Sequence, residues 1–121
     1  MSKRDIETEA DLETLVNAFY DRIQKDALLA PFFTKTHWEH HLPRMISFWN
    51  FLLIGKTGFS GNVFDAHIQR HIKEKHFTAW LSLFEQSVDD LYEGKTADLA
   101  KQKATELGMI FSWKLKELEG E

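Results

Sequence analysis

The sequence predicts an all-α fold in a single domain covering residues 1–121. Apolar residues recur at helical spacing along nearly the whole chain, and no segment shows the sustained alternation of a half-buried strand. The 121 residues suit one domain, and the 43% hydrophobic content is that of a globular protein rather than a disordered one. A domain of this length buries roughly two thirds of its unfolded surface, so it has a core without disulfides.

The first helix is expected over residues 11–25, because the apolar residues there fall on one face. That face carries Leu12, Leu15, Val16, Phe19 and Ile23, with Tyr20 at its edge. Residues 27–33 contain a proline and are too few for a full helix. We expect them to form a turn that directs Phe32 and Phe33 towards the interior.

A second helix is expected to stop at Gly55. Thr36 is followed three residues later by Glu39, which is the capping-box pattern of a helix start. Pro43 conflicts with that start, because a proline beyond the first turn removes a backbone hydrogen bond and costs about 3 kcal/mol. Either the helix kinks at Pro43, or it begins near His40 with Pro43 in its first turn; we favour the second alternative.

The C-terminal half is expected to contain three helices after a loop. Residues 55–62 include three glycines, which is typical of a flexible loop. A short helix around residues 63–70 and a longer one over about 74–92 follow, each with its own apolar residues. Gly94 interrupts the chain, and Thr96 is a suitable N-cap for the last helix.

Composition excludes several classes of protein. The chain has no cysteine, which excludes disulfides, thiolate ligands and cysteine-type zinc sites, and suits a reducing cytoplasm. No apolar run approaches the ~20 residues of a membrane span, and the N-terminus lacks the apolar region of a signal peptide. The net charge is −4 with acids and bases interspersed, so we expect no nucleic-acid partner.

Histidines are the informative candidates for chemistry, because glycine-rich phosphate loops, GxSxG and HExxH motifs are missing from the sequence. His37 and His41 are four residues apart, and so are His67 and His71. This spacing places two imidazoles on one helix face, where they could bind zinc. A helical zinc-binding or interaction protein is therefore one hypothesis, although no carboxylate is clearly placed as a further ligand. The simpler interpretation is that most of these histidines are solvated.

His67 differs from the other histidines in its surroundings. It lies on the short predicted helix after the glycine-rich loop, with Phe64, Ile68 and Ile72 nearby. An imidazole presented from a short helix to an apolar slot is what a pentacoordinate haem iron requires. Its second ring nitrogen would then need an acceptor to set the tautomer.

Several segments, taken together, resemble the third group of the truncated haemoglobins. They are Phe19 with Tyr20, Pro31 with Phe32 and Phe33, His41 seven and eight residues before Phe48 and Trp49, Ala66 with His67, and residues 76–84 (HFTAWLSLF). These segments extend over about residues 12–115. Each is common in helical cores, but the set in this order and spacing is fairly specific.

The resemblance implies a shortened globin fold, a two-over-two helical sandwich that holds haem b. His67 falls on the position of the proximal iron ligand, while Tyr20, Trp80 and His41 fall on distal positions. Met45 would continue the face of His41 over the haem. The other residues expected to line the haem are Phe32, Phe33, Phe48, Trp49, Phe64, His71 and Phe77.

Pocket polarity then suggests what the protein would do with dioxygen. The Tyr20 hydroxyl and the Trp80 indole are hydrogen-bond donors, and dioxygen at a haem iron carries partial negative charge on its outer atom. Two donors in a dry pocket should hold it and slow its release. Slow release suits bulk transport poorly, so nitric oxide detoxification or peroxide chemistry with a reductase partner is an expected alternative. The alternative for Tyr20 and Trp80 is that they are amphipathic core residues whose polar groups find partners elsewhere.

One stretch departs from the family pattern. Arg70 and His71 stand where the family tends towards leucine and proline, which leaves His71 as a rival to His67 for the iron. The alternative is that Arg70, His71 or Lys73 lies at the haem edge and offsets propionate charge. Pro43, just after His41, is expected to affect the distal geometry.

Overall fold

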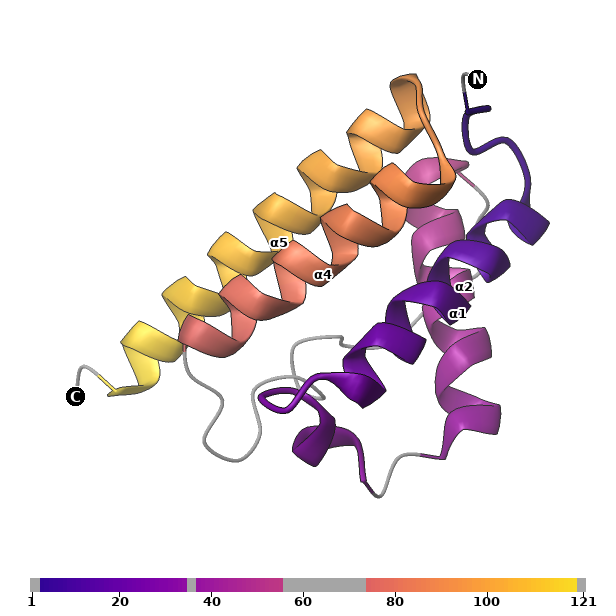
Figure 1. The fold of residues 1–121 in the computed structure, drawn as a ribbon. Coiled ribbons are helices and arrows are strands. Elements are labelled where there is room, and N and C mark those ends of the chain that lie inside the picture. Colours follow the sequence, from indigo (N-terminus) through magenta and orange to yellow (C-terminus); the bar gives the residue numbers. More distant parts are fainter. Residues whose placement is uncertain (1–2, 35–36, 56–73, 120–121) are drawn as a thin grey trace.

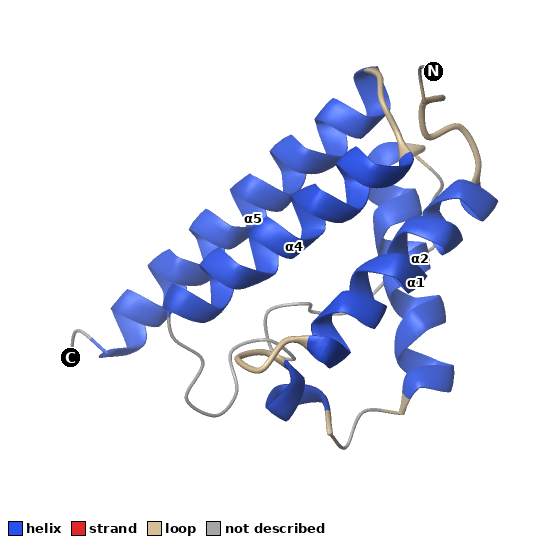
Figure 2. Cartoon of the chain, in the orientation of Figure 1, coloured by secondary structure: helices blue, strands red, loops and turns tan. Residues whose placement is uncertain are grey.

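The computed structural model describes residues 3–34, 37–55 and 74–119, and within them it confirms an all-α fold (Figure 1, Figure 2). The described residues form four α-helices and one short 3-10 helix, with no strand. In chain order these are α1 (Glu9–Lys25), η1 (Ala30–Phe33), α2 (Trp38–Leu53), α4 (Glu74–Leu91) and α5 (Lys95–Glu119). The short helix expected at 63–70, and all of the glycine-rich loop except its first residue, lie outside the described residues.

The helices pack as two pairs. α4 and α5 lie side by side, joined by a tight turn, and α1 packs against both α2 and α4 (Figure 1). α2 in turn contacts α5. This is the two-over-two arrangement that the family resemblance implies. No helix among the described residues is long and apolar enough to cross a membrane.

The core lies where the two pairs meet. Phe19 of α1 and Phe84 of α4 are fully buried, and their rings meet edge to face with centroids 5.2 Å apart. Ala100 and Ala104 of α5 are completely buried, because small side chains let α5 approach α4 closely. Burying a large apolar side chain contributes about 1.5–3 kcal/mol, so this interior holds the helix pairs together.

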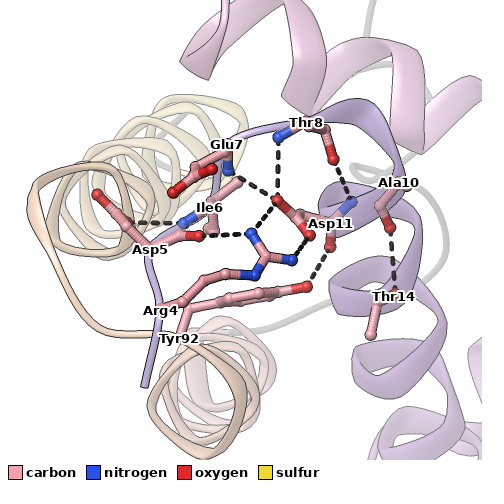
Figure 3. Close-up of polar contacts among 9 residues, drawn as sticks. All are labelled: Arg4, Asp5, Ile6, Glu7, Thr8, Ala10, Asp11, Thr14 and Tyr92. Atoms are coloured by element: carbon pink, nitrogen blue, oxygen red, sulfur yellow. Dashed lines mark hydrogen bonds and ion pairs between the residues drawn. The ribbon is translucent and has the colours of Figure 1, made fainter. Parts of the chain in front are cut away.

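α1 begins at Glu9, two residues before the expected start, because Thr8 caps it. The Thr8 hydroxyl accepts from the backbone N–H of Asp11, and the Asp11 carboxylate accepts from Thr8 N–H at 3.0 Å (Figure 3). Arg4 binds the same carboxylate with two guanidinium nitrogens, one of them at 2.8 Å. The Arg4 hydrogen bonds, helped by the N–H groups of Glu7 and Thr8, hold the pKa of Asp11 well below its usual range. The N-terminal segment is thereby fastened to α1.

α2 starts two residues before the expected start near His40, and the expectation that Pro43 lies in its first turn is wrong. The helix begins at Trp38 with His37 as its N-cap residue, and no side-chain hydrogen bond caps it. Thr36, the predicted capping residue, lies outside the described residues. Pro43 is the sixth residue of the helix, beyond its first turn, so the helix continues past a missing N–H group. Downstream burial of Met45, Phe48 and Trp49 offsets that loss.

Gly55 ends α2 as expected. Its backbone φ is +86°, a conformation that glycine adopts without a Cβ penalty, and its N–H donates to the Asn50 carbonyl at 3.0 Å. The end of α2 was readable from sequence because a glycine terminator acts locally.

The prediction that Thr96 caps the last helix is wrong. α5 begins one residue after Gly94, so Thr96 lies inside its first turn. The carboxylate of Asp5 instead accepts from the N–H groups of Thr96 and Ala97, at 2.9 and 2.8 Å. The cap thus comes from a residue about ninety positions earlier in the chain, which local sequence patterns do not reveal.

α4 and the segment after α1 agree with expectation. α4 covers residues 74–91 against the predicted 74–92. The expected turn at 27–33 is completed by the 3-10 helix, with Pro31 in its opening turn. Phe32 and Phe33 are both half-buried there, and Phe33 packs against the core.

Candidate functional site

Four rings from three elements gather at one end of the α1–α2 pair. Tyr20 of α1 lies with its ring centroid 4.8 Å from that of His41 on α2, at 80° between planes. Trp38, at the start of α2, contacts Tyr20 at 5.4 Å and His41 at 5.6 Å. Phe33 of η1 contacts Tyr20 and stacks on Trp38, both at 5.8 Å. We call these four residues the Tyr20 cluster.

Local sequence features place each ring of the cluster. Tyr20 follows Phe19, so it lies at the edge of the buried face of α1. Pro31 opens the 3-10 turn that carries Phe33 back towards α1. Trp38 and His41 are three residues apart on α2, which puts them on the same side of the helix.

Tyr20 is suited to donate a hydrogen bond. Its side chain is 4% exposed, and burial raises the pKa of its phenol well above the usual value. The hydroxyl therefore stays protonated throughout the physiological pH range. Such a group donates to a ligand in a dry site, where the hydrogen bond is stronger than in water.

His41 is enclosed by aromatic rings. Tyr20 and Trp38 meet it edge to face, and the Phe33 centroid is 6.1 Å away. Its Nε2 atom is buried from solvent. The structure thus brings Tyr20 and His41 together, as the sequence interpretation required, while their roles towards a ligand stay predictions.

Trp80 lies in a neighbouring layer of rings. It stacks on Phe84 with centroids 5.9 Å apart, and Phe84 stacks on Trp49 at 4.7 Å. Phe19 joins the two layers, because its ring meets Trp80 at 5.8 Å and Tyr20 at 4.9 Å. Among the described ring contacts, Trp80 is therefore linked to Tyr20 through Phe19.

The other expected lining residues divide between α2, η1 and α4. Met45, Phe48 and Trp49 of α2 are all buried. Phe77 is buried near the start of α4, beside His76, whose ring meets Phe32 at 4.8 Å. These positions lie on α2, η1 and α4, each of which contacts α1, the helix that carries Tyr20.

Two site residues were missed by the sequence interpretation. Trp38 belongs to the Tyr20 cluster, and its spacing three residues before His41 was the available signal. His76 is buried against Phe32, yet a histidine at a helix start is ordinarily a solvated residue.

The candidate metal ligands fall partly outside the described residues. His67, His71 and Phe64 lie outside the described residues, so His67 as the iron ligand stays a prediction. Within the described ranges, no group of three or more histidine, cysteine, aspartate or glutamate side chains is placed to hold a metal ion. His37 is exposed, whereas His41 lies in the Tyr20 cluster.

Comparison with known proteins agrees with this arrangement. A family profile described as bacterial-like globin matches residues 5–111. A curated relative, the group 3 truncated hemoglobin ctb of Campylobacter jejuni, is 24% identical over 110 residues, covering 85% of this chain and 87% of that protein. The crystal structure of a group III truncated hemoglobin from the same species superimposes with a TM-score of 0.84 at 24% identity. It covers 93% of this chain and 94% of that one, which confirms the predicted fold.

Proposed function

This chain belongs to the bacterial-like globin family, and from that premise we propose that it is a haem protein that binds dioxygen and other diatomic ligands. The cofactor would be haem b, since the sequence contains no cysteine for a covalent link or a thiolate ligand. We further propose a single cytoplasmic domain, which the lack of cysteine suits. The Tyr20 cluster is the observation that carries the proposal.

The chemistry of the described residues fits the distal side of a haem. Met45 and Phe48 are buried apolar side chains on α2, the helix that carries His41. Such side chains would contact the porphyrin, while Tyr20 and His41 supply the polar groups. His67, which lies outside the described residues, would bind the haem iron. When bound, the haem supplies an iron with an open coordination position for a diatomic molecule.

Tyr20 would hold the ligand by donating a hydrogen bond from its hydroxyl group. Because burial raises the pKa of the phenol, the donor remains available at all physiological pH values. Trp80 is proposed as a second donor through its indole N–H. If each hydrogen bond contributes about 1 kcal/mol, the pair slows ligand release roughly 30-fold.

Slow release favours a role in redox chemistry over bulk transport. We propose nitric oxide detoxification or peroxide chemistry, with a reductase as partner, and pocket polarity is its support. The rate at which the oxygenated protein consumes nitric oxide, measured with and without a reductase, tests this proposal. A rate no higher than that of a generic globin would remove the enzymatic part and leave oxygen binding.

The haem proposal is tested by the visible absorption spectrum of the purified protein. A strong Soret band, or its appearance after haemin is added, is the expected result. A colourless protein that cannot take up haemin would refute it. Trp113→Ala serves as the control substitution for these spectra and should leave the Soret band unchanged, because that tryptophan is exposed on α5.

The iron ligand is tested by two variants that differ by one helical turn. His67→Gly should lose the axial bond, and added imidazole should restore the spectrum, whereas His71→Ala should leave it unchanged. The reverse pattern would assign the ligand to His71.

A further inference from the structure

Trp38 contacts each of the other three rings in the Tyr20 cluster. We propose that Trp38 is a positioning residue, which holds the imidazole of His41 against Tyr20. The expected effect of Trp38 on ligand entry rests on the proposed haem function, whereas its effect on the positions of the rings does not.

Trp38 lies between two elements. On one side it stacks on Phe33 with 20° between the ring planes, so η1 supports one face of the indole. Towards α2 it meets the His41 imidazole at 79°, an edge-to-face contact typical of favourable ring pairs. The indole therefore packs between Phe33 of η1 and the His41 imidazole, so the position of η1 affects that of His41.

The helix end that carries Trp38 has no side-chain cap, and its first backbone hydrogen bonds run from His40 and His41 N–H to the His37 carbonyl. The first turn of any helix leaves its N–H groups without partners inside the helix, and no side chain caps α2 at His37. Pro43 removes a further N–H group, which would have donated to the carbonyl of Glu39 in that turn. Ring contacts fasten this turn to α1 and η1: Trp38 contacts Tyr20 and Phe33, and His41 contacts the same two rings.

Without the indole, the His41 imidazole would be held less firmly against Tyr20. Removing the ring takes away one of the three aromatic contacts around the imidazole and loosens the turn that carries it. The imidazole would then turn outwards to water. With the His41 imidazole turned out of the distal pocket, ligands should enter faster.

The test measures how close the two rings are, in the protein as purified and in its carbon monoxide complex. Nuclear Overhauser cross-peaks between ring protons of Tyr20 and His41 are compared with those between Phe19 and Phe84, which report the core. Trp38→Ala should lower the first set at least threefold relative to the second. Trp38→Phe, which keeps an aromatic ring, should retain them.

Trp113→Ala is the matched control, because it removes an exposed tryptophan from another helix and should change neither set. If the core peaks also vanish in Trp38→Ala, Trp38→Leu decides, since it keeps apolar bulk but no ring. Full-strength Tyr20–His41 peaks in the variant that retains its core would overturn the proposal.

Ligand entry gives a second readout. The association rate of carbon monoxide should rise about threefold or more in Trp38→Ala and stay near that of the wild type in Trp38→Phe. A protein that takes up no haem would refute the proposed function, yet the ring cross-peaks would still support or overturn the role of Trp38. The two failures are therefore distinguishable.

Discussion

Removing the Asp5 carboxylate should destabilise the protein by loosening the start of α5. This carboxylate accepts from the N–H groups of Thr96 and Ala97 at 2.9 and 2.8 Å, and from Ile6 N–H at 2.8 Å. Losing a side-chain cap costs about 0.5–2 kcal/mol, and the negative charge also favours a helix N-terminus. Because two first-turn donors lose their acceptor, we expect Asp5→Ala to lower the free energy of unfolding by about 2 kcal/mol.

The pH dependence gives this prediction a sharper signature. Burial acts to raise the pKa of Asp5, but hydrogen bonds from Thr96, Ala97 and Ile6 outweigh it and leave the pKa below its usual value. A carboxyl group with a lowered folded-state pKa contributes stability above its unfolded pKa of about 3.9 and loses it as the pH falls further. The difference between wild type and Asp5→Ala should therefore be complete at neutral pH and shrink below about pH 4.

Urea unfolding followed by far-ultraviolet circular dichroism measures this difference, with haem occupancy matched between the proteins. Asp5→Asn is the control variant, because it keeps one acceptor oxygen but not the charge, and should lose about half as much stability. A loss in Asp5→Ala below about 0.5 kcal/mol at neutral pH, a typical value for an ordinary surface substitution, would refute the reasoning.

Three further changes probe the turn, the site and the core. Gly94→Ala should cost about 2 kcal/mol or more, because φ is +139° and an added Cβ would lie 2.5 Å from Asp5 Cγ; thermal unfolding checks this value. Tyr20→Phe should speed dioxygen release about fivefold, since it removes a donor worth roughly 1 kcal/mol while keeping the ring. Stopped-flow kinetics measure that release, and an unchanged rate would exclude Tyr20 as a donor. Phe84→Ala should cost about 3–5 kcal/mol in urea unfolding, because the ring is fully buried; a loss near 1 kcal/mol would mean that the cavity collapses.

Helices with a strong apolar stripe were predictable from the sequence. α1 and α4 agree with their expected ranges within two residues, and Gly55 ends α2 where the pattern placed it. Periodicity is a local property, so burial of one helix face leaves a trace in consecutive residues. The start of α2 was misjudged, because the cost of Pro43 was weighed without the burial that offsets it.

The candidate site was predictable only in part. Tyr20 and His41 do come together, but that expectation came from the order and spacing of several motifs, since an amphipathic tyrosine and a histidine are ordinary in any helix. Trp38 was missed because a tryptophan is likewise ordinary in an amphipathic helix. His67 and His71 lie outside the described residues, so the choice between them stays a prediction.

The sequence by itself determined the class of fold, the family and the approximate ranges of the described helices. Apolar periodicity, chain length and composition act through local rules, and the family motifs keep their order along the chain. Only the tertiary structure decided how chain ends and rings meet: Asp5 caps α5, Arg4 binds Asp11, and Trp38 stands between η1 and His41. A hydrogen-bond acceptor or an aromatic face recognises its partner by position in space. Asp5 and Thr96 are about ninety residues apart in the sequence, so no local pattern of residues indicates that they meet.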